Sequence, residues 1–401
     1  MSLWGSPMRR FTMVRRLSCM SSLCLFCSTA LLNHQINLQM GVQTLLKKLK
    51  QLNRALRNKQ KKLKLRYYCQ RFDKAPQTTV ALNDIKSLAL LRWDNKLGDA
   101  IMSGLLIQML QRYRPDIQVS VITPSFCASW FEQSTQCNII PCGKRGVKTA
   151  RALSQYRGQF DAVVELGTSF DFKELLALHE LGAAYNIGFN KESHPIFNVC
   201  LPNEHVHFKD RYLAVARLFC DVPESADIPL IPYSTSTIVD PHTTTVAINL
   251  FGSSKYRQFS KTEANKLLNH WLRDFPQDTL YLIPVPGKIE FLKELVTELE
   301  NPRVQLLSET PSLEFSLQLL SQVDLCVTPD TSVVHMASAL NTPILAIYAD
   351  DPRNFQEWHP LSDKAEVVFN PPAKDRNDRV YVHDFEWSEL KQKRESLLSS
   401  H

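Results

Sequence analysis

The glycine-rich loops that bind dinucleotides and nucleoside triphosphates are missing from this sequence of 401 residues. No G-x-G-x-x-G motif follows any predicted strand, which argues against an enzyme that uses a nicotinamide or flavin cofactor. The G-x-x-x-x-G-K spacing of a P-loop is absent as well. No H-x-x-x-H pair or paired-carboxylate signature predicts a metal site. The only C-x-x-C, from Cys24 to Cys27, lacks the second pair that would complete a zinc site.

Acidic residues are almost absent from the N-terminal segment. Residues 1–74 contain sixteen Lys/Arg and a single acid, Asp73, which gives them a net charge of +15, whereas residues 75–401 carry −8. The main body of the chain is therefore mildly acidic. This distribution argues against a body that binds nucleic acid and favours local contact between the N-terminal segment and an anionic surface.

The N-terminal segment also lacks a hydrophobic run long enough to span a bilayer. Residues 17–32 form a short, Ser- and Cys-rich apolar run behind four arginines, a pattern that imitates a secretory signal. We interpret residues 1–39 as a poorly defined extension that reflects a translation start assigned too far upstream. The ten cysteines are scattered through the chain, which is typical of reduced, small hydrophobic residues in a cytosolic protein.

Residues 40–79 follow a helical pattern. From Met40 to Lys74, leucines and a valine recur at spacings of three and four, and lysines and arginines fill the other faces. A basic amphipathic helix over 40–74 can lie in the interface of an anionic membrane. The alternative is a solvated helix that packs against the body along one edge.

From residue 80 onward, apolar runs alternate with segments of helical length, which predicts an α/β fold. In a first domain, residues 80–235, we expect strands over 87–93, 117–122 and 160–166 and helices over 100–113 and 172–181. In a second domain, residues 245–383, we expect strands over 246–251, 279–283, 304–307, 325–327 and 344–348, with helices over 262–275, 288–300, 313–322 and 332–340.

The two domains are separated by residues 232–245, which are rich in Ser, Thr and Pro and lack apolar periodicity. Residues 384–401 predict a final polar helix that can cross back to the first domain. Together these elements predict two Rossmann-like, doubly wound domains that face each other across a cleft.

Three motifs are expected at this cleft. The first, R-W-D-N-K-L-G-D, ends in Asp99, whose carboxylate could accept a proton from a hydroxyl nucleophile; the alternative is that Asp99 only caps its helix. The second follows a strand, and its backbone and cations suit a diphosphate leaving group; the alternative is an ordinary basic surface loop. Its candidate residues are Asn249, Gly252, Ser253, Ser254, Lys255 and Arg257.

The third motif is a strand–turn–helix corner that begins at Pro329. Asp330 and Thr331 are good N-cap residues for the helix that starts at Ser332, and His335 lies one turn into that helix. The free N–H groups and the positive dipole end of such a helix can bind a phosphate or a sugar hydroxyl. The alternative is a capped helix with a buried histidine.

In this order and spacing, the motifs resemble those of the bacterial lipopolysaccharide heptosyltransferases of glycosyltransferase family 9, over about residues 80–370. The segment from Arg92 to Asp99 is similar to the family's R-x-D-x-x-G-D loop, with one extra residue. Pro329 to Pro343 is similar to its P-D-T-G-x-x-H-x-A-x-A-x-x-x-P motif. Arg257 corresponds to a basic residue before x-W-P, and Trp358-His359-Pro360 to a late W-x-P segment.

The resemblance implies a GT-B fold and an inverting transfer of heptose from ADP-heptose to the lipopolysaccharide inner core, with no metal or other cofactor. It assigns Asp99 as the general base. Arg257, with Lys255 as the second candidate, would stabilise the departing diphosphate. The donor would be held by Asp330, Thr331, Ser332 and His335.

The acceptor that the family implies places the protein in the cytoplasm, at the periphery of the inner membrane. The chain departs from the family pattern at Ser332, where the family has glycine, and at Phe259 and Ser260, where it has tryptophan and proline. Two alternatives therefore stay open: a family member that uses another nucleotide sugar for a cell-surface glycan, and a non-catalytic member that binds sugar nucleotides.

Overall fold

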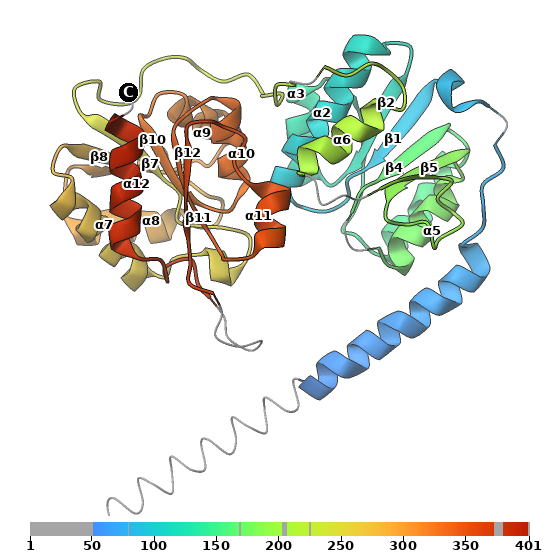
Figure 1. Cartoon of the computed structure of the whole chain (residues 1–401), viewed down its shortest axis with the longest axis horizontal. Helices are drawn as coiled ribbons and strands as arrows, with labels where there is room; N and C mark the ends of the chain where they lie inside the picture. Colours follow the sequence, from blue (N-terminus) through green and yellow to red (C-terminus); the bar gives the residue numbers. More distant parts are fainter. Residues whose placement is uncertain are drawn as a thin grey trace, which may run out of the picture. The chain divides into compact units, whose positions relative to one another are not determined.

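The computed structural model describes residues 51–78, 80–167, 170–202, 207–223, 226–372 and 380–399. The chain divides into two compact units, Met1–Tyr68 and Cys69–His401. Residues 51–72 are helical (Figure 1), which confirms that part of the helix predicted over 40–74. The extension over 1–39 and the first part of the predicted helix lie outside the described residues. No helix in the described part of the chain is both long enough and apolar enough to cross a bilayer.

The larger unit contains two six-stranded sheets in which all paired strands are parallel. The first sheet has the order β3-β2-β1-β4-β5-β6 and the second the order β12-β11-β10-β7-β8-β9. In both sheets the chain starts at a central strand, winds outward, and then returns to build the other half. This is the doubly wound order that the sequence predicts.

The strands of the first sheet are β1 (Ser87–Leu91), β2 (Gln118–Thr123), β3 (Asn138–Pro141), β4 (Ala162–Glu165), β5 (Tyr185–Phe189) and β6 (Val199–Leu201). Those of the second are β7 (Thr244–Ile248), β8 (Asp278–Leu282), β9 (Val304–Gln305), β10 (Leu325–Pro329), β11 (Ile344–Tyr348) and β12 (Ala365–Phe369). We call each sheet with its helices a lobe. β7 begins inside the segment expected to be a linker, because Thr245 is buried and bonds to Asp324.

The α-helices of the first lobe are α2 (Leu97–Tyr113), α3 (Ser125–Ser134), α4 (Val147–Ala152), α5 (Phe172–Leu181) and α6 (Phe208–Ala216). Those of the second are α7 (Lys261–Asp274), α8 (Ile289–Leu299), α9 (Leu313–Leu320), α10 (Ser332–Ala339), α11 (Pro352–Trp358) and α12 (Trp387–Ser399). Short 3₁₀ turns cover Leu82–Asp84, Leu153–Tyr156 and Lys255–Arg257. Since the helices cover the sheets, the central strands are continuous apolar runs rather than alternating ones.

The C-terminal helix α12 packs on the second lobe, beside β12 and β11 (Figure 1). Its Arg394 pairs with the buried carboxylate of Asp278, and the indole N–H of Trp387 donates to Asp274 over 2.9 Å. Leu390 and Leu397 enter the apolar core of that lobe. The expectation that this helix crosses back to the first domain is therefore wrong, because its apolar and charged partners all belong to the second lobe.

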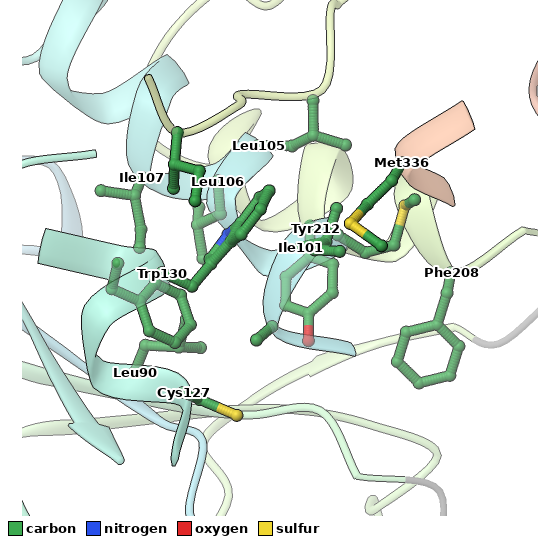
Figure 2. Close-up of a cluster of buried hydrophobic side chains, with 14 of the residues drawn as sticks. Leu90, Ile101, Leu105, Leu106, Ile107, Cys127, Trp130, Phe208, Tyr212 and Met336 are labelled. Atoms are coloured by element: carbon green, nitrogen blue, oxygen red, sulfur yellow. The ribbon is translucent and has the colours of Figure 1, made fainter. Parts of the chain in front are cut away.

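An apolar contact joins the two lobes. Met336 of α10 lies in one apolar cluster with Ile101 and Leu105 of α2 and with Tyr212 of α6 (Figure 2). A second contact joins α6 to α11. There the Phe208 and Trp358 rings stack with centroids 4.2 Å apart, and Arg211 donates to Glu357 over 2.7 Å. The Arg211 side chain is 1% exposed and that of Glu357 9%, so this is a buried ion pair.

Glu357→Ala should lower the free energy of unfolding by about 3–5 kcal/mol, because the Arg211 guanidinium is then left buried without a partner. Arg353→Ala is the matched control. Its side chain is 67% exposed and reaches the same carboxylate at 3.6 Å, so its loss should cost no more than about 1 kcal/mol. Urea unfolding followed by tryptophan fluorescence measures both. Equal effects of the two substitutions on the free energy of unfolding would contradict a stabilising ion pair between Arg211 and Glu357.

Candidate functional site

A cleft of about 790 Å³ lies at the carboxyl ends of β1, β7 and β10 and is lined by residues of both lobes. These strands are where each sheet reverses its winding, which is the usual ligand-binding place in doubly wound folds. All three predicted motifs reach this cleft. The predicted site residues that line it are Asp99, Asn249, Gly252, Ser253, Arg257, Asp330, Thr331, Ser332 and His335.

Asp99 lies in the first turn of α2, which begins at Leu97 and not at Ala100 as the sequence suggested. Its side chain does not cap the helix; Lys96 occupies the N-cap position without a side-chain bond. One carboxylate oxygen lies 3.5 Å from Arg92 and the other 3.7 Å from Lys96. Burial raises the pKa of Asp99, and these two cations oppose that rise. Asp99 is thus a carboxylate of increased basicity in a cleft, as a general base requires.

Arg92 has a role that the sequence did not reveal. Its guanidinium is 5% exposed and pairs with Asp94 at 2.6 Å as well as with Asp99. It follows directly after β1, and its backbone N–H continues the sheet by bonding to Ile122. Arg92 is therefore a rigidly held cation that positions the Asp99 carboxylate. An arginine at a strand end, followed closely by Asp94 and Asp99, was the available signal.

Gly98 explains how the first turn of α2 comes close to α10. A Cβ atom at Gly98 would lie 3.2 Å from Cδ2 of His335 and 3.7 Å from Cα of Ser332. The helix expected over 100–113 would leave this glycine in the loop before it. Instead it lies inside the helix and allows the first turns of two helices, one from each lobe, to approach each other. This contact brings Asp99 beside the strand–turn–helix corner that begins at Pro329.

His335 is buried, with 3% of its surface exposed. Burial, reinforced by nearby His359, lowers its pKa to about 4, so the imidazole is neutral at physiological pH. Its Nδ1 has no hydrogen-bond partner among the described residues. His335 therefore lines the cleft as a neutral ring and brings no positive charge to it.

The loop after β7 folds back on itself. Phe251 forms a bridge with Gln258, and a Cβ at Gly252 would lie only 2.7 Å from Cβ of Arg257 and 3.1 Å from Cγ2 of Thr331. Glycine is therefore needed at 252 because Arg257 and Thr331 come so close. Asn249 is buried and donates its amide hydrogens to the hydroxyls of Thr328 and Thr331. It supports the corner rather than presenting free donors to a ligand.

Arg257 is the cation that this loop presents to the cleft. Its guanidinium pairs with Asp330 at 2.9 Å and donates to the Asp330 carbonyl at 3.3 Å. Burial raises the pKa of Asp330, while Arg257 and a hydrogen bond from Asn354 oppose that rise. The pair places the positive charge beside Thr331, the N-cap of α10, whose hydroxyl accepts from the backbone N–H of Val333.

Two of the predicted residues do not line the cleft, and a cation from another loop of the second lobe does. Lys255 is exposed, with its ammonium over the ring of Tyr256, and Ser254 also lies outside the lining. Lys288, just before α8, lines the cleft; its ammonium lies 3.2 Å from the Gln258 side-chain oxygen. A lysine after a P-x-P-G turn at the end of β8 was the missed signal, because β8 neighbours β7 only in the folded sheet.

Phe259 and Ser260, two departures from the family pattern, have structural roles. Phe259 is 4% exposed and belongs to the core of the second lobe. Ser260 is the N-cap of α7, and its hydroxyl accepts from the backbone N–H of Glu263. Neither residue lines the cleft, so these substitutions maintain packing and helix capping rather than ligand contacts.

Comparisons with known proteins point to one family. Residues 147–386 match the sequence model of glycosyltransferase family 9 (heptosyltransferase). A relative, lipooligosaccharide heptosyltransferase 2 of Haemophilus influenzae, is 24% identical over 306 residues, which are 68% of this chain and 85% of that protein.

Two solved structures share the fold. The E. coli ADP-heptose lps heptosyltransferase II is 20% identical with a TM-score of 0.57, and the match covers 79% of this chain and 99% of that one. A family 9 glycosyltransferase of Veillonella parvula is 15% identical with a TM-score of 0.62, covering 81% and 100%. The family model matches more than half of this chain. This GT-B chain therefore belongs to glycosyltransferase family 9, the heptosyltransferase family, and is a glycosyltransferase.

Proposed function

We propose that this protein transfers a heptose from ADP-heptose to the inner core of lipopolysaccharide, with inversion at the anomeric carbon and without a metal. The observation that carries the proposal is the placement of a buried carboxylate, Asp99, and a fixed cation, Arg257, in one cleft but on opposite lobes. The named activity of the E. coli structure and of the Haemophilus influenzae relative supports the choice of donor and acceptor.

In the proposed reaction, Asp99 accepts the proton of the acceptor hydroxyl as its oxygen attacks the anomeric carbon of the donor. The new glycosidic bond forms as the bond to the diphosphate oxygen breaks, and the nucleoside diphosphate leaves with that electron pair. A single displacement of this kind inverts the configuration. The raised pKa of Asp99 favours the proton transfer, because a stronger base takes the proton earlier in the step.

The negative charge that develops on the leaving diphosphate needs positive groups nearby. Arg257, Lys288 and the N-terminus of α10 line the same wall of the cleft. Such fixed cations and dipoles stabilise a transition state without having to reorganise as the charge forms. Two cations and a helix terminus can take the place of a divalent metal, which supports the metal-free reaction.

The helix of residues 51–68 suits attachment to the membrane that carries the acceptor. Leu52, Leu56, Leu63 and Tyr67 are each at least half exposed. At 100° per residue they lie within about 60° of one another on one side of the helix. The same residues 51–68 include seven Lys/Arg and no acid. We propose that this apolar stripe enters the interface of the anionic inner membrane on its cytoplasmic side, with the cations at the lipid headgroups.

Asp99→Asn should lower transfer of heptose from ADP-heptose to a truncated core acceptor by about 10²–10⁴-fold, the usual contribution of a general base. Since Asp99 acts deprotonated and its pKa is raised, the wild-type rate should fall with decreasing pH already above the ordinary range of an aspartate. Asp94→Asn, which removes the other partner of Arg92, is the control and should cost much less.

The assay is run with a chelator present and with UDP- and GDP-sugars as competing donors. Transfer from ADP-heptose that survives chelation supports the donor and the metal-free reaction. Preference for another nucleotide sugar would overturn the donor while leaving the family intact.

Lys288→Ala should reduce kcat/KM and weaken ADP binding by roughly 10–100-fold, because a charge-assisted contact to a phosphate is lost. Lys255→Ala removes the same charge from outside the cleft and should change both values by less than about twofold. Steady-state kinetics and calorimetric titration with ADP measure the two variants. If Lys255→Ala lost more ADP affinity and kcat/KM than Lys288→Ala, the diphosphate would bind on the side of the loop that carries Lys255, outside the cleft.

Substituting the apolar stripe, as in Leu56→Glu with Leu63→Glu, should abolish sedimentation of the full chain with phosphatidylglycerol vesicles. Leu65→Glu, on the opposite side of the helix, is the matched control and should bind like the wild type. Vesicles of neutral phosphatidylcholine should bind all three weakly, because the cations then have no anionic partner. Equal binding by the stripe variant and the control would refute membrane attachment through this stripe.

A further inference from the structure

Three side chains of different chemistry meet in the first lobe, away from the cleft. Asp73 Oδ2 lies 2.7 Å from Nδ1 of His194, and Cys69 Sγ lies 4.0 Å from the same nitrogen. Cys69 and Asp73 are spaced i, i+4 where the helix over 51–72 ends, and His194 lies in the loop after β5. Their ligand atoms all lie within 4.8 Å of one another. None of the three lines the cleft.

The geometry excludes a nucleophilic Cys–His–Asp triad. In a triad the nucleophile contacts one ring nitrogen and the carboxylate holds the other. Here Cys69 and Asp73 both approach Nδ1 of His194. Three ligand atoms within 4.8 Å of one another, from a thiol, an imidazole and a carboxylate, can instead bind one metal ion.

The distances fit a zinc ion after a small adjustment. With zinc–ligand bonds of about 2.0–2.3 Å, neighbouring ligands of a tetrahedral ion stand roughly 3.3–3.6 Å apart. The observed 2.7 Å and 4.0 Å lie on either side of this range. A mixed nitrogen, oxygen and sulfur donor set suits Zn²⁺ better than the hard ions Mg²⁺ or Ca²⁺.

The surroundings support the ligands in the way that metal sites require. The second carboxylate oxygen of Asp73 accepts the backbone N–H of Ile196 over 3.0 Å, which fixes the orientation of the carboxylate. The ring of Phe170 packs on that of His194 with centroids 4.6 Å apart and shields one side. The Asp73 side chain is 7% exposed and that of His194 20%.

The charge balance of the cluster is also that of a cation site. A Cys69 thiolate beside the Asp73 carboxylate would be unfavourable on its own, because two anions would then lie close together. A divalent cation reverses this relation and deprotonates the thiol on binding. One Zn²⁺ with a thiolate, a carboxylate and a neutral imidazole has no net charge.

We propose that Cys69 Sγ, Asp73 Oδ2 and His194 Nδ1 form a binding site for one Zn²⁺ ion, with a water molecule as the fourth ligand. The ion would tie residues 69–73, where the helix ends, to the loop after β5. Its role is structural, and it does not depend on the transfer reaction.

The test is zinc binding by the full-length chain, with Cys24→Ser and Cys27→Ser to remove the competing C-x-x-C pair. The metal-free protein is titrated with Zn²⁺ against a chromophoric chelator. We expect one Zn²⁺ per chain, and at least a 100-fold weaker affinity in both Cys69→Ser and His194→Ala. Cys200→Ser removes another half-buried thiol of the same lobe and should bind zinc like the parent protein.

Substitution with Co²⁺ tests the ligand set in the parent protein, without relying on the folding of a variant. Thiolate coordination should give a sulfur-to-cobalt charge-transfer band, which Cys200→Ser retains. Absence of stoichiometric zinc uptake, or zinc affinity of Cys69→Ser equal to that of the parent, would reduce the cluster to an Asp–His hydrogen bond with a neighbouring thiol. Because no step of the test measures transfer, its failure would leave the proposed catalytic function unaffected.

Discussion

The close contact between the first turns of α2 and α10 is the constraint on which the site depends. It brings a residue of the first lobe, Gly98, against a residue of the second, His335, at a separation that leaves no room for a Cβ atom without a shift. The apolar cluster around Met336 and the buried pair of Arg211 and Glu357 hold the same two lobes together. The Asp99 carboxylate therefore reaches the wall that carries Arg257 through packing, and not through any direct bond between the two.

The two cations on that wall differ in how far a neighbouring group compensates their charge. Arg257 is partly neutralised by Asp330, which fixes the guanidinium but weakens its field in the cleft. Lys288 has a neutral partner, the Gln258 side-chain oxygen, so its charge stays undiminished. In the proposed reaction, the rigid, partly compensated Arg257 would position the diphosphate, and the uncompensated Lys288 would attract it.

Much of the fold could be predicted from the sequence, where local signals and tertiary packing agree. The segment of β10, α10 and β11 has two apolar strands, a threonine N-cap and a proline stop, and its observed bounds lie within two residues of those predicted. The start of α2 was predicted three residues too late. Glycine usually favours a turn, but Gly98 lies inside the helix because α10 leaves little room for a side chain there. β3, β5 and β6 were missed because they are short and only partly apolar. Lys288 was missed, because the P-x-P-G turn before it gives no sign that strand pairing brings this lysine to Gln258.

Because α12 remains with the second sheet, each lobe is one uninterrupted stretch of chain: residues 87–216 hold every strand and α-helix of the first, and residues 244–399 those of the second. The fold can therefore be recombined at a single crossover, in the segment over 217–243. A gene fusion at that point would exchange the wall that bears Asp99 while keeping the wall that bears Arg257 and Lys288. The main requirement on a new partner would be a surface that accepts Met336, Glu357 and Trp358. The first lobe could therefore be replaced as a unit, without rebuilding the wall that bears Arg257 and Lys288.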